Sequence, residues 1–226
     1  MAASGVGTAV FWGGGVAGAI LLALFFTSGS LLSQAAVRRA PGTPDHGPRT
    51  ARQVLANGTC ATAGALALPF TTAGWVVLVG AIAAALADTW ATEIGAHSSR
   101  PPRLITDLTP VRPGVSGGIT LLGTVAGIAG ALLVAGGAYL AGTPAGVPSA
   151  ALAGGVSGML VDSLLGATLQ AKFHCPACSV EIERAMHGCG RRADHSRGLG
   201  WLDNDVVNLL GTAAGATVAL AWWHLT

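Results

Sequence analysis

Long apolar runs separated by short polar segments dominate this chain of 226 residues. The longest run, residues 54–93, exceeds the length of one membrane span and is interrupted at Pro69. Proline removes a helical hydrogen-bond donor and disfavours helix in the residue before it. Because about 20 apolar residues cross a bilayer as a helix, the pattern predicts an all-α fold. We expect a polytopic membrane helical bundle of about six transmembrane helices, at residues 8–27, 53–68, 72–97, 116–140, 148–171 and 203–224.

Two of these segments have a second interpretation. Residues 8–27 also resemble the apolar part of a signal peptide, but no basic stretch precedes them and no small-x-small cleavage motif follows. We therefore keep them as a mature helix. Residues 53–68 are short for a span, and a tilted or re-entrant segment is the alternative to a full crossing.

Composition supports a membrane protein and argues against a soluble one. The chain is 51% hydrophobic and 10% charged, with a mean hydropathy of +0.60, whereas soluble domains carry about 25% charge. Its 34 glycines would let membrane helices approach closely. We expect one integral membrane domain over residues 1–226, and we expect no nucleic-acid partner. The oligomeric state is open, and a homo-oligomer is compatible with the sequence.

The basic residues predict the topology. All 12 Lys and Arg lie in residues 38–52, 100–112 and 172–197, within predicted loops at 28–52, 98–114 and 172–202. The predicted turns near residues 70 and 144 carry none. By the positive-inside rule the three loops face the cytoplasm, and both termini lie on the opposite side. The expected location is the inner or plasma membrane of the cell.

Acidic side chains gather in the cytoplasmic half of this predicted bundle. An acid inside a membrane helix costs roughly 2.5–3.5 kcal/mol on insertion scales and by default marks a functional site. We predict that Asp88, Glu93, Asp162 and Asp205 form a catalytic cluster, with Asn57, Asn204 and Asn208 as polar supports. Hard oxygen ligands suit Mg²⁺, and we assign that ion to the aspartates. Glu93 is about 140° around an ideal helix from Asp88, so both reach one ion only if the helix is distorted.

A glycine-rich segment on the same side is a candidate phosphate site. Ser116, Gly117 and Gly118 are predicted at the start of the fourth helix, where free N–H groups attract anions, and Arg103 can bind phosphate bidentately. The alternatives are structural. The glycines can serve packing alone, the arginines can serve topology alone, and Asp203 can be an ordinary N-cap.

The third polar segment carries a separate metal-binding pattern. Cys175, Cys178, His187 and Cys189 have the residue types of a structural Zn²⁺ site, and reduced cytoplasmic thiols favour a metal over a disulfide. His174 or His195 can replace His187 in this set, and a redox or incidental role is the alternative. Cys60 falls within a predicted helix and is expected to serve packing.

These residues carry a resemblance to one family. The ordered motifs are RQVLANG at 52–58, ADTWATEIG at 87–95, PRLIT at 102–106, GG at 117–118, VDSLLGA at 161–167 and DNDVVN at 203–208. Together they resemble the family of transmembrane protein 19 and plant phytyl-phosphate kinase. The match covers nearly the whole chain from Phe25 onward.

The resemblance implies an enzyme. Its expected activity is transfer of a phosphoryl group from a nucleoside triphosphate, CTP being the expected donor, to a membrane isoprenyl monophosphate such as phytyl or geranylgeranyl phosphate. The partners would be the lipid bilayer, the isoprenyl phosphate and the nucleotide. A transporter with an intramembrane acidic site is the alternative, although the acids cluster at one face and no inverted repeat is visible. A membrane scaffold whose zinc loop binds a partner is a third class.

Overall fold

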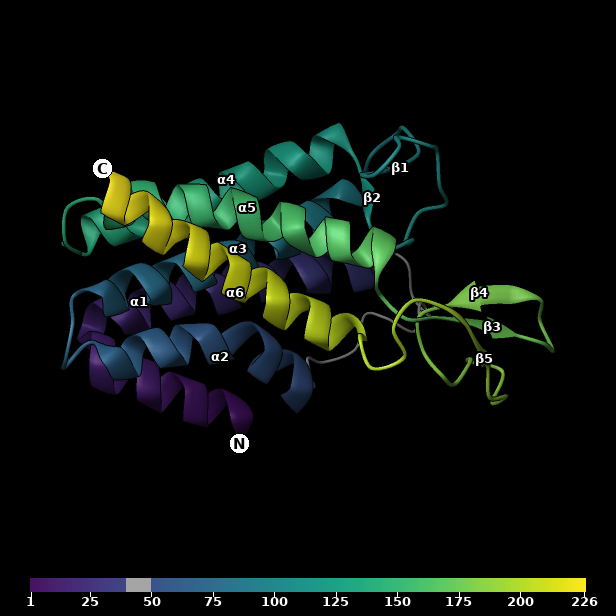
Figure 1. The fold of residues 1–226 in the computed structure, drawn as a ribbon, viewed down its shortest axis with the longest axis horizontal. Coiled ribbons are helices and arrows are strands. Elements are labelled where there is room, and N and C mark those ends of the chain that lie inside the picture. The colour runs from purple at the N-terminus through teal and green to yellow at the C-terminus, as the bar shows by residue number, and fades with distance from the viewer. Residues whose placement is uncertain (40–49) are drawn as a thin grey trace.

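The computed structural model describes residues 1–39 and 50–226 and confirms a helical membrane bundle (Figure 1). Five helices of the described part are long and apolar enough to cross a membrane. The remaining helix, α2, has 17 residues and is about 26 Å long, against roughly 30 Å for the hydrocarbon core. The helices are α1 (Ala2–Arg39), α2 (Ala51–Ala67), α3 (Ala73–Gly95), α4 (Leu121–Leu140), α5 (Val147–Thr168) and α6 (Asn204–Leu225).

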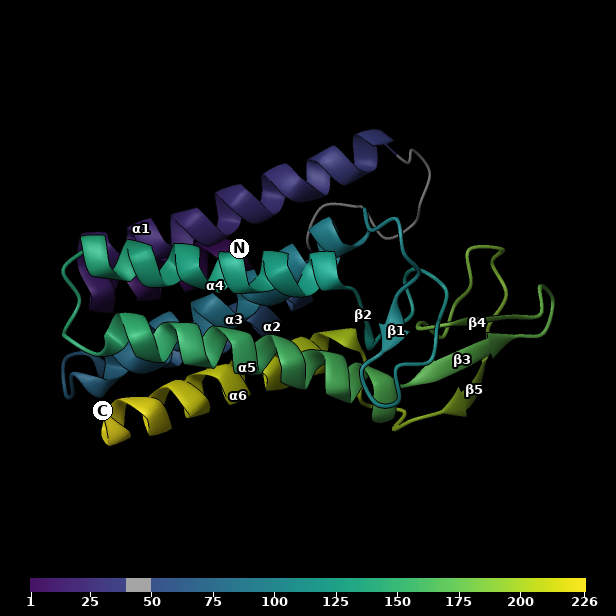
Figure 2. The same ribbon diagram turned by 90° about the horizontal axis from the view of Figure 1, so that it is seen from above.

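The first helix is a hairpin of two arms that meet at Gly15. This glycine has φ 55° and ψ −147°, outside the helical region. A Cβ on Gly18 would lie 3.0 Å from the carbonyl oxygen of Val10, a residue that would be about 12 Å away along a straight helix. The chain therefore reverses, and the N-terminus lies beside the middle of the bundle, far from the C-terminus (Figures 1 and 2).

Two sequence predictions for this region are wrong. The termini do not lie together, because a segment predicted as one span at 8–27 is divided at Gly15. The segment predicted as a loop from 28 to 52 is helical as far as Arg39, and residues 40–49 lie outside the described part. The hydroxyls of Thr27 and Ser28 donate to the carbonyls of Ala23 and Leu24 at 2.6 and 2.7 Å, so these polar side chains continue the helix and do not end it.

Local capping explains where the later helices begin. Thr50 and Gln53 form a reciprocal capping box at the start of α2. Thr120 caps α4 by accepting from the N–H of Gly123 at 2.9 Å, so the fourth helix begins at Leu121 and not at residue 116. Asp203 caps α6 by accepting from the N–H of Val206 at 3.1 Å, as the N-cap interpretation predicts.

Short strands replace two of the predicted loops. In the segment between α3 and α4, β1 (Arg103–Leu104) pairs antiparallel with β2 (Gly118–Ile119). Between α5 and α6, an antiparallel sheet of order β4-β3-β5 contains β3 (Lys172–Cys175), β4 (Val180–Ile182) and β5 (Asp194–Arg197). Both sheets lie at one end of the bundle, with the starts of α2 and α6 (Figures 1 and 2). We call this the polar end, formed by residues 96–120 and 169–203.

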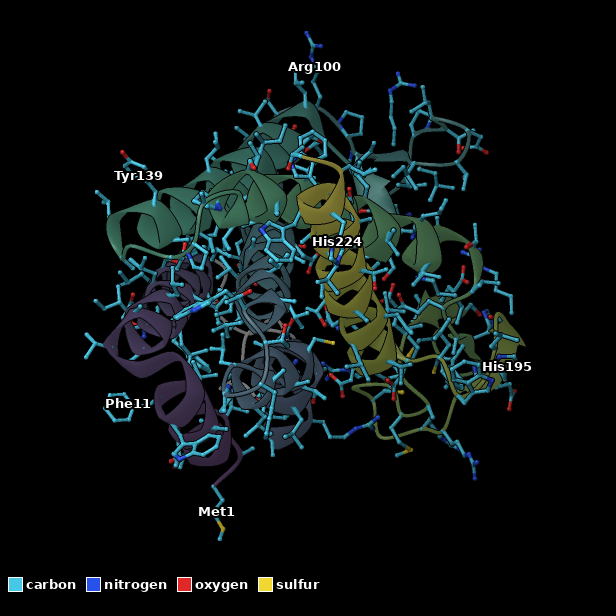
Figure 3. The ribbon with its side chains drawn as sticks, turned by 60° about the vertical axis from the view of Figure 1, so that its left-hand side comes forward. Met1, Phe11, Arg100, Tyr139, His195 and His224 are labelled. Atoms are coloured by element: carbon cyan, nitrogen blue, oxygen red, sulfur yellow. The ribbon has the colours of Figure 1, made fainter. Side chains whose placement is uncertain are left out.

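The third helix is the centre of the bundle. It contacts each of the other five helices of the described part, and its residues Leu78, Val79 and Leu86 are fully buried. The outer surface is apolar, as a lipid-facing surface would be. Phe11 and Tyr139 point outward in Figure 3 and are 58% and 74% exposed.

Candidate functional site

Glycines bring α5 and α6 into backbone contact where the site forms. A Cβ on Gly158 would lie 2.7 Å from the carbonyl oxygen of Gly211 and 2.5 Å from Cβ of Ala84. A Cβ on Gly211 would lie 3.3 Å from Oδ2 of Asp162. Such close crossings of small residues are typical of membrane helices. This crossing places the carboxylate of Asp162 directly against α6.

A narrow crevice collects four of the predicted site residues from four helices. Asn57 of α2, Asp88 of α3, Asp162 of α5 and Asn208 of α6 all line it. The space between its lining atoms is about 150 Å³, open solvent included, and the side chains leave essentially no room for a water molecule. The other lining residues are small or short, namely Ala84, Ala85, Gly158, Gly211 and Thr212. The prediction that acids and amides from separate helices converge is correct for these four.

The two aspartates are set below the polar end and not at mid-bundle. Asp88 and Asp162 lie about two helical turns before Gly95 and Thr168, the last residues of their helices, which is roughly 10 Å. Both aspartates therefore lie nearer to the polar end than to the opposite ends of their helices.

Asp162 has an acceptor atom without a protein partner. Its Oδ2 is buried, and it accepts no hydrogen bond from the described residues. Burying an ionised carboxylate costs several kcal/mol unless a cation or donors compensate. Carboxylate and amide oxygens are the ligands that Mg²⁺ prefers. Asp88 and Asp162, with the side-chain amides of Asn57 and Asn208, therefore suit a small divalent cation by donor chemistry.

Asp205 lies in an ion-pair cluster about one helical turn before Asn208. The guanidinium of Arg52 contacts Asp203 at 2.8 Å and Asp205 at 3.4 Å. Asn204 is the exposed first residue of α6. Neither Asp205 nor Asn204 is among the crevice-lining residues.

Glu93 is separated from the other predicted acids. Its Oε1 accepts a hydrogen bond of 2.5 Å from the hydroxyl of Ser33 in α1, and the nearby indole N–H of Trp90 donates to Ser28 at 3.4 Å. The helix is continuous through this region, so Glu93 and Asp88 keep different faces. The acids of the motif at 87–95 therefore contact different parts of the protein.

A carboxylate already contacts the predicted phosphate site. The backbone N–H of Ser116 donates to Glu183 at 3.1 Å, and the Ser116 hydroxyl also donates to that carboxylate. Gln170 Nε2 donates to the same group at 3.1 Å, and Lys172 forms an ion pair with it. Burial would raise the pKa of Glu183, but the hydrogen bonds from Lys172 and Ser116 and the charge of Lys172 hold it below its usual value.

The glycines beside Ser116 serve packing in this structure. Gly117 has φ +81°, and a Cβ there would lie 2.4 Å from Cβ of Ala167 in α5. Gly118 lies in β2 and not at a helix start. Arg103 donates from Nη1 to the carbonyl of Leu108 at 2.7 Å within its own segment. The alternative of a structural role therefore holds for Gly117, and none of these residues lines the crevice.

The cysteine and histidine side chains of the third segment converge as predicted. The ligand atoms of Cys175, Cys178, His187 and Cys189 all lie within 4.8 Å of one another. The hydrogen bond with His187 lowers the pKa of Cys189 to about 6. His195 instead packs edge-on against Phe173, with ring centroids 5.6 Å apart. Cys60 packs against the bundle core, as expected.

Sequence reasoning missed several residues of this region. Thr212 lines the crevice one helical turn after Asn208, and a search of that helix face would have found it. Arg52 and Glu183 act through contacts between segments far apart in sequence. No local pattern signals such contacts.

Comparison with known proteins identifies related chains. The family described as "Integral membrane protein DUF92" matches residues 1–216. "Uncharacterized membrane protein MJ0933" of Methanocaldococcus jannaschii is 31% identical over 204 residues, covering 89% of this chain and 74% of the relative. "Protein PGR" of Arabidopsis thaliana is 31% identical over 225 residues, covering 85% and 76%. No solved structure matches the chain. The chain belongs to the DUF92 family of integral membrane proteins.

Proposed function

We propose that this protein is a nucleoside-triphosphate-dependent kinase, with CTP as the expected donor, that converts a membrane isoprenyl monophosphate to its diphosphate. The observation that carries the proposal is the meeting of Asp88 and Asp162, from two helices, in one crevice below the polar end. The motif resemblance supplies the substrate class. The proposed location is the inner or plasma membrane, with the polar end in the cytoplasm.

The crevice residues suit binding of a metal-bound phosphate. Asp88 and Asp162 would hold Mg²⁺, with Asn57 and Asn208 beside them. When bound, this ion would neutralise charge on the transferred phosphoryl group. The crevice is packed too tightly to admit a nucleotide, so the base and sugar would lie at the polar end. Arg52 pairs with Asp203 and Asp205 at the start of α6, and its charge can attract phosphate there.

The transfer needs no covalent enzyme intermediate. An oxygen of the lipid monophosphate forms a bond to the γ-phosphorus of the nucleotide. The bond from that phosphorus to the oxygen bridging the β- and γ-phosphates breaks, and the nucleoside diphosphate leaves. The isoprenyl tail would remain among apolar side chains while its phosphate reaches the polar end. Positioning and electrostatics carry most of the catalysis in such reactions.

Activity of the purified protein tests the proposal. With Mg²⁺, each of the four nucleotides and phytyl or geranylgeranyl phosphate, the intact chain should form the lipid diphosphate. Asp88→Asn should abolish product, because it removes a charge from the crevice. Asp107→Asn is the matched control, since that acid is exposed in the segment between α3 and α4. An Asp88→Asn variant as active as wild type would refute the site.

One observation favours a transporter as the second candidate. The α1 helix is broken at Gly15 and folds back on itself, and broken or re-entrant helices are common in transporters. Nucleotide binding separates the two functions. The kinase should bind CTP in detergent in a Mg²⁺-dependent way, whereas a transporter of this type should bind none.

A further inference from the structure

The segment between α5 and α6 forms a sheet without a hydrophobic core. We call residues 172–202 the cysteine lobe. Neither of the buried hydrophobic clusters found in the described residues contains a residue of this lobe. A segment this short rarely folds on apolar burial alone, and small folds commonly rely on disulfides or a metal. Some other interaction must hold β3, β4 and β5 together.

Four ligand side chains meet where such an interaction is needed. Cys175 ends β3 and is fully buried, Cys178 lies in the following turn, and His187 and Cys189 come from the loop before β5. The Sγ atoms of Cys175 and Cys189 are 3.8 Å apart, and Nδ1 of His187 is 3.0 Å from Sγ of Cys189. Tetrahedral zinc with Zn–S bonds of about 2.3 Å requires sulfur atoms about 3.8 Å apart. A disulfide requires about 2.05 Å.

We infer that the cysteine lobe binds a structural zinc ion through Cys175, Cys178, His187 and Cys189. The chain supplies all four ligands, so no position remains open for water or substrate, which is typical of a structural site and not of a catalytic one. Thiolate and imidazole ligands select zinc over Mg²⁺. The ion links the turn after β3 to the loop before β5 and replaces the missing core.

This ion also has a consequence for the rest of the polar end. Glu183 directly follows β4 in the lobe, and its carboxylate accepts from Ser116, Gln170 and Lys172. By fixing the lobe, zinc fixes Glu183 and with it the segment before β2. The inference concerns the stability of this region and does not depend on the proposed kinase activity.

Metal analysis of the purified full-length protein tests the inference. Wild type, purified without added chelator, should contain about one zinc ion per chain. Cys178→Ser, at an exposed ligand, should lose most of it, and Cys60→Ser should retain it. Cobalt substitution of wild type should give the thiolate charge-transfer and d–d absorption bands of a tetrahedral site, bands that Cys178→Ser lacks.

Thiol reactivity provides a measurement that does not require a variant to fold. Three cysteines of wild type should be protected from a thiol reagent and should become reactive when a strong chelator removes zinc. Wild type that contains no zinc and shows freely reactive thiols at Cys175, Cys178 and Cys189 would overturn the inference. So would recovery of two of the lobe's thiols only after reduction, which would indicate a disulfide.

Discussion

Neutralising Glu183 is the sharpest test of how the polar end is held together. The carboxylate accepts hydrogen bonds from Ser116 and Gln170 and pairs with Lys172, whose side chain is only 4% exposed. In Glu183→Gln the side-chain carbonyl can still accept from Ser116. The same carbonyl position faces the Lys172 ammonium but is neutral and provides no counter-charge, and the new amide N–H₂ faces Nε2 of Gln170, which is also a donor. Lys172 is left as a buried charge without a counter-ion.

The expected loss of stability is about 2–3 kcal/mol. Breaking a buried ion pair typically costs about 3–5 kcal/mol. The Glu183 side chain is 28% exposed, so water can replace part of the lost interaction. We therefore expect a loss below that typical value, about 2–3 kcal/mol. The control is Glu181→Gln on β4, two residues before Glu183. Its partner Arg197 and Glu181 itself are 50% and 49% exposed, and such surface pairs contribute about 0–1 kcal/mol.

Hydrogen–deuterium exchange measures this loss locally in the detergent-solubilised protein. A cost of about 2–3 kcal/mol corresponds to exchange about 30- to 150-fold faster in the peptides covering 114–120 and 172–183. Glu181→Gln should change them less than about fivefold. Adding Lys172→Met to Glu183→Gln should restore much of the protection, because no charge is then left unpaired. Equal exchange in the Glu183 and Glu181 variants would refute this reasoning.

The pH dependence follows from the sign of the pKa shift. The pKa of Glu183 lies below its ordinary value of 4.5 in the folded protein, because the bonds from Lys172 and Ser116 outweigh the opposing effect of burial. Its contribution is therefore complete above about pH 4.5 and is lost as the pH falls through the folded pKa. The difference between wild type and Glu183→Gln should stay constant from about pH 8 to 6 and shrink below about pH 4.5.

Two further predictions concern glycines that set the helix geometry, and thermal unfolding in detergent checks both. Gly15→Ala should destabilise the protein by about 1–3 kcal/mol, because almost only glycine adopts φ 55° with ψ −147°. Its control is Gly5→Ala, at a helical position with open space around it, which should be neutral or stabilising. Gly158→Ala should cost about 1–3 kcal/mol by displacing Gly211 or Ala84, and Gly136→Ala, which meets nothing within 4 Å, should stabilise α4 by up to about 1 kcal/mol. A lower melting temperature for either control than for its partner variant would contradict the assigned geometry.

Helix positions and buried acids are predicted best where burial in lipid dictates the pattern of apolar and polar residues. Apolar length and the break at Pro69 place the helices, and the intramembrane cost of Asp88 and Asp162 correctly identifies acids that meet in the crevice. Residue type and spacing also sufficed to predict that Cys175, Cys178, His187 and Cys189 lie together, and the binding of zinc by this group stays a prediction.

Sequence reasoning fails where the decisive quantity is a backbone angle or a distant contact. Gly15 stands among many glycines of the apolar runs, and nothing local distinguishes the one that reverses the chain. The segment at Ser116 reads as an anion site because it offers free donors, but Glu183 supplies the anion from the cysteine lobe. The sequence could predict that the segment at Ser116 binds an anion. It could not predict that the anion is Glu183, because that contact depends on tertiary structure.

The crevice and the polar end are held by different forces, and this separates their roles. Asp88 and Asp162 stand on helices packed by backbone contact at Gly158 and Gly211, a rigid arrangement that does not involve the cysteine lobe. The segment at Ser116 depends on Glu183 and so on the lobe. Damage to the lobe should therefore alter what approaches the crevice from the polar end while leaving the spacing of the two aspartates intact. A metal bound in the crevice would then persist after the lobe has opened, and the two sites can be examined independently.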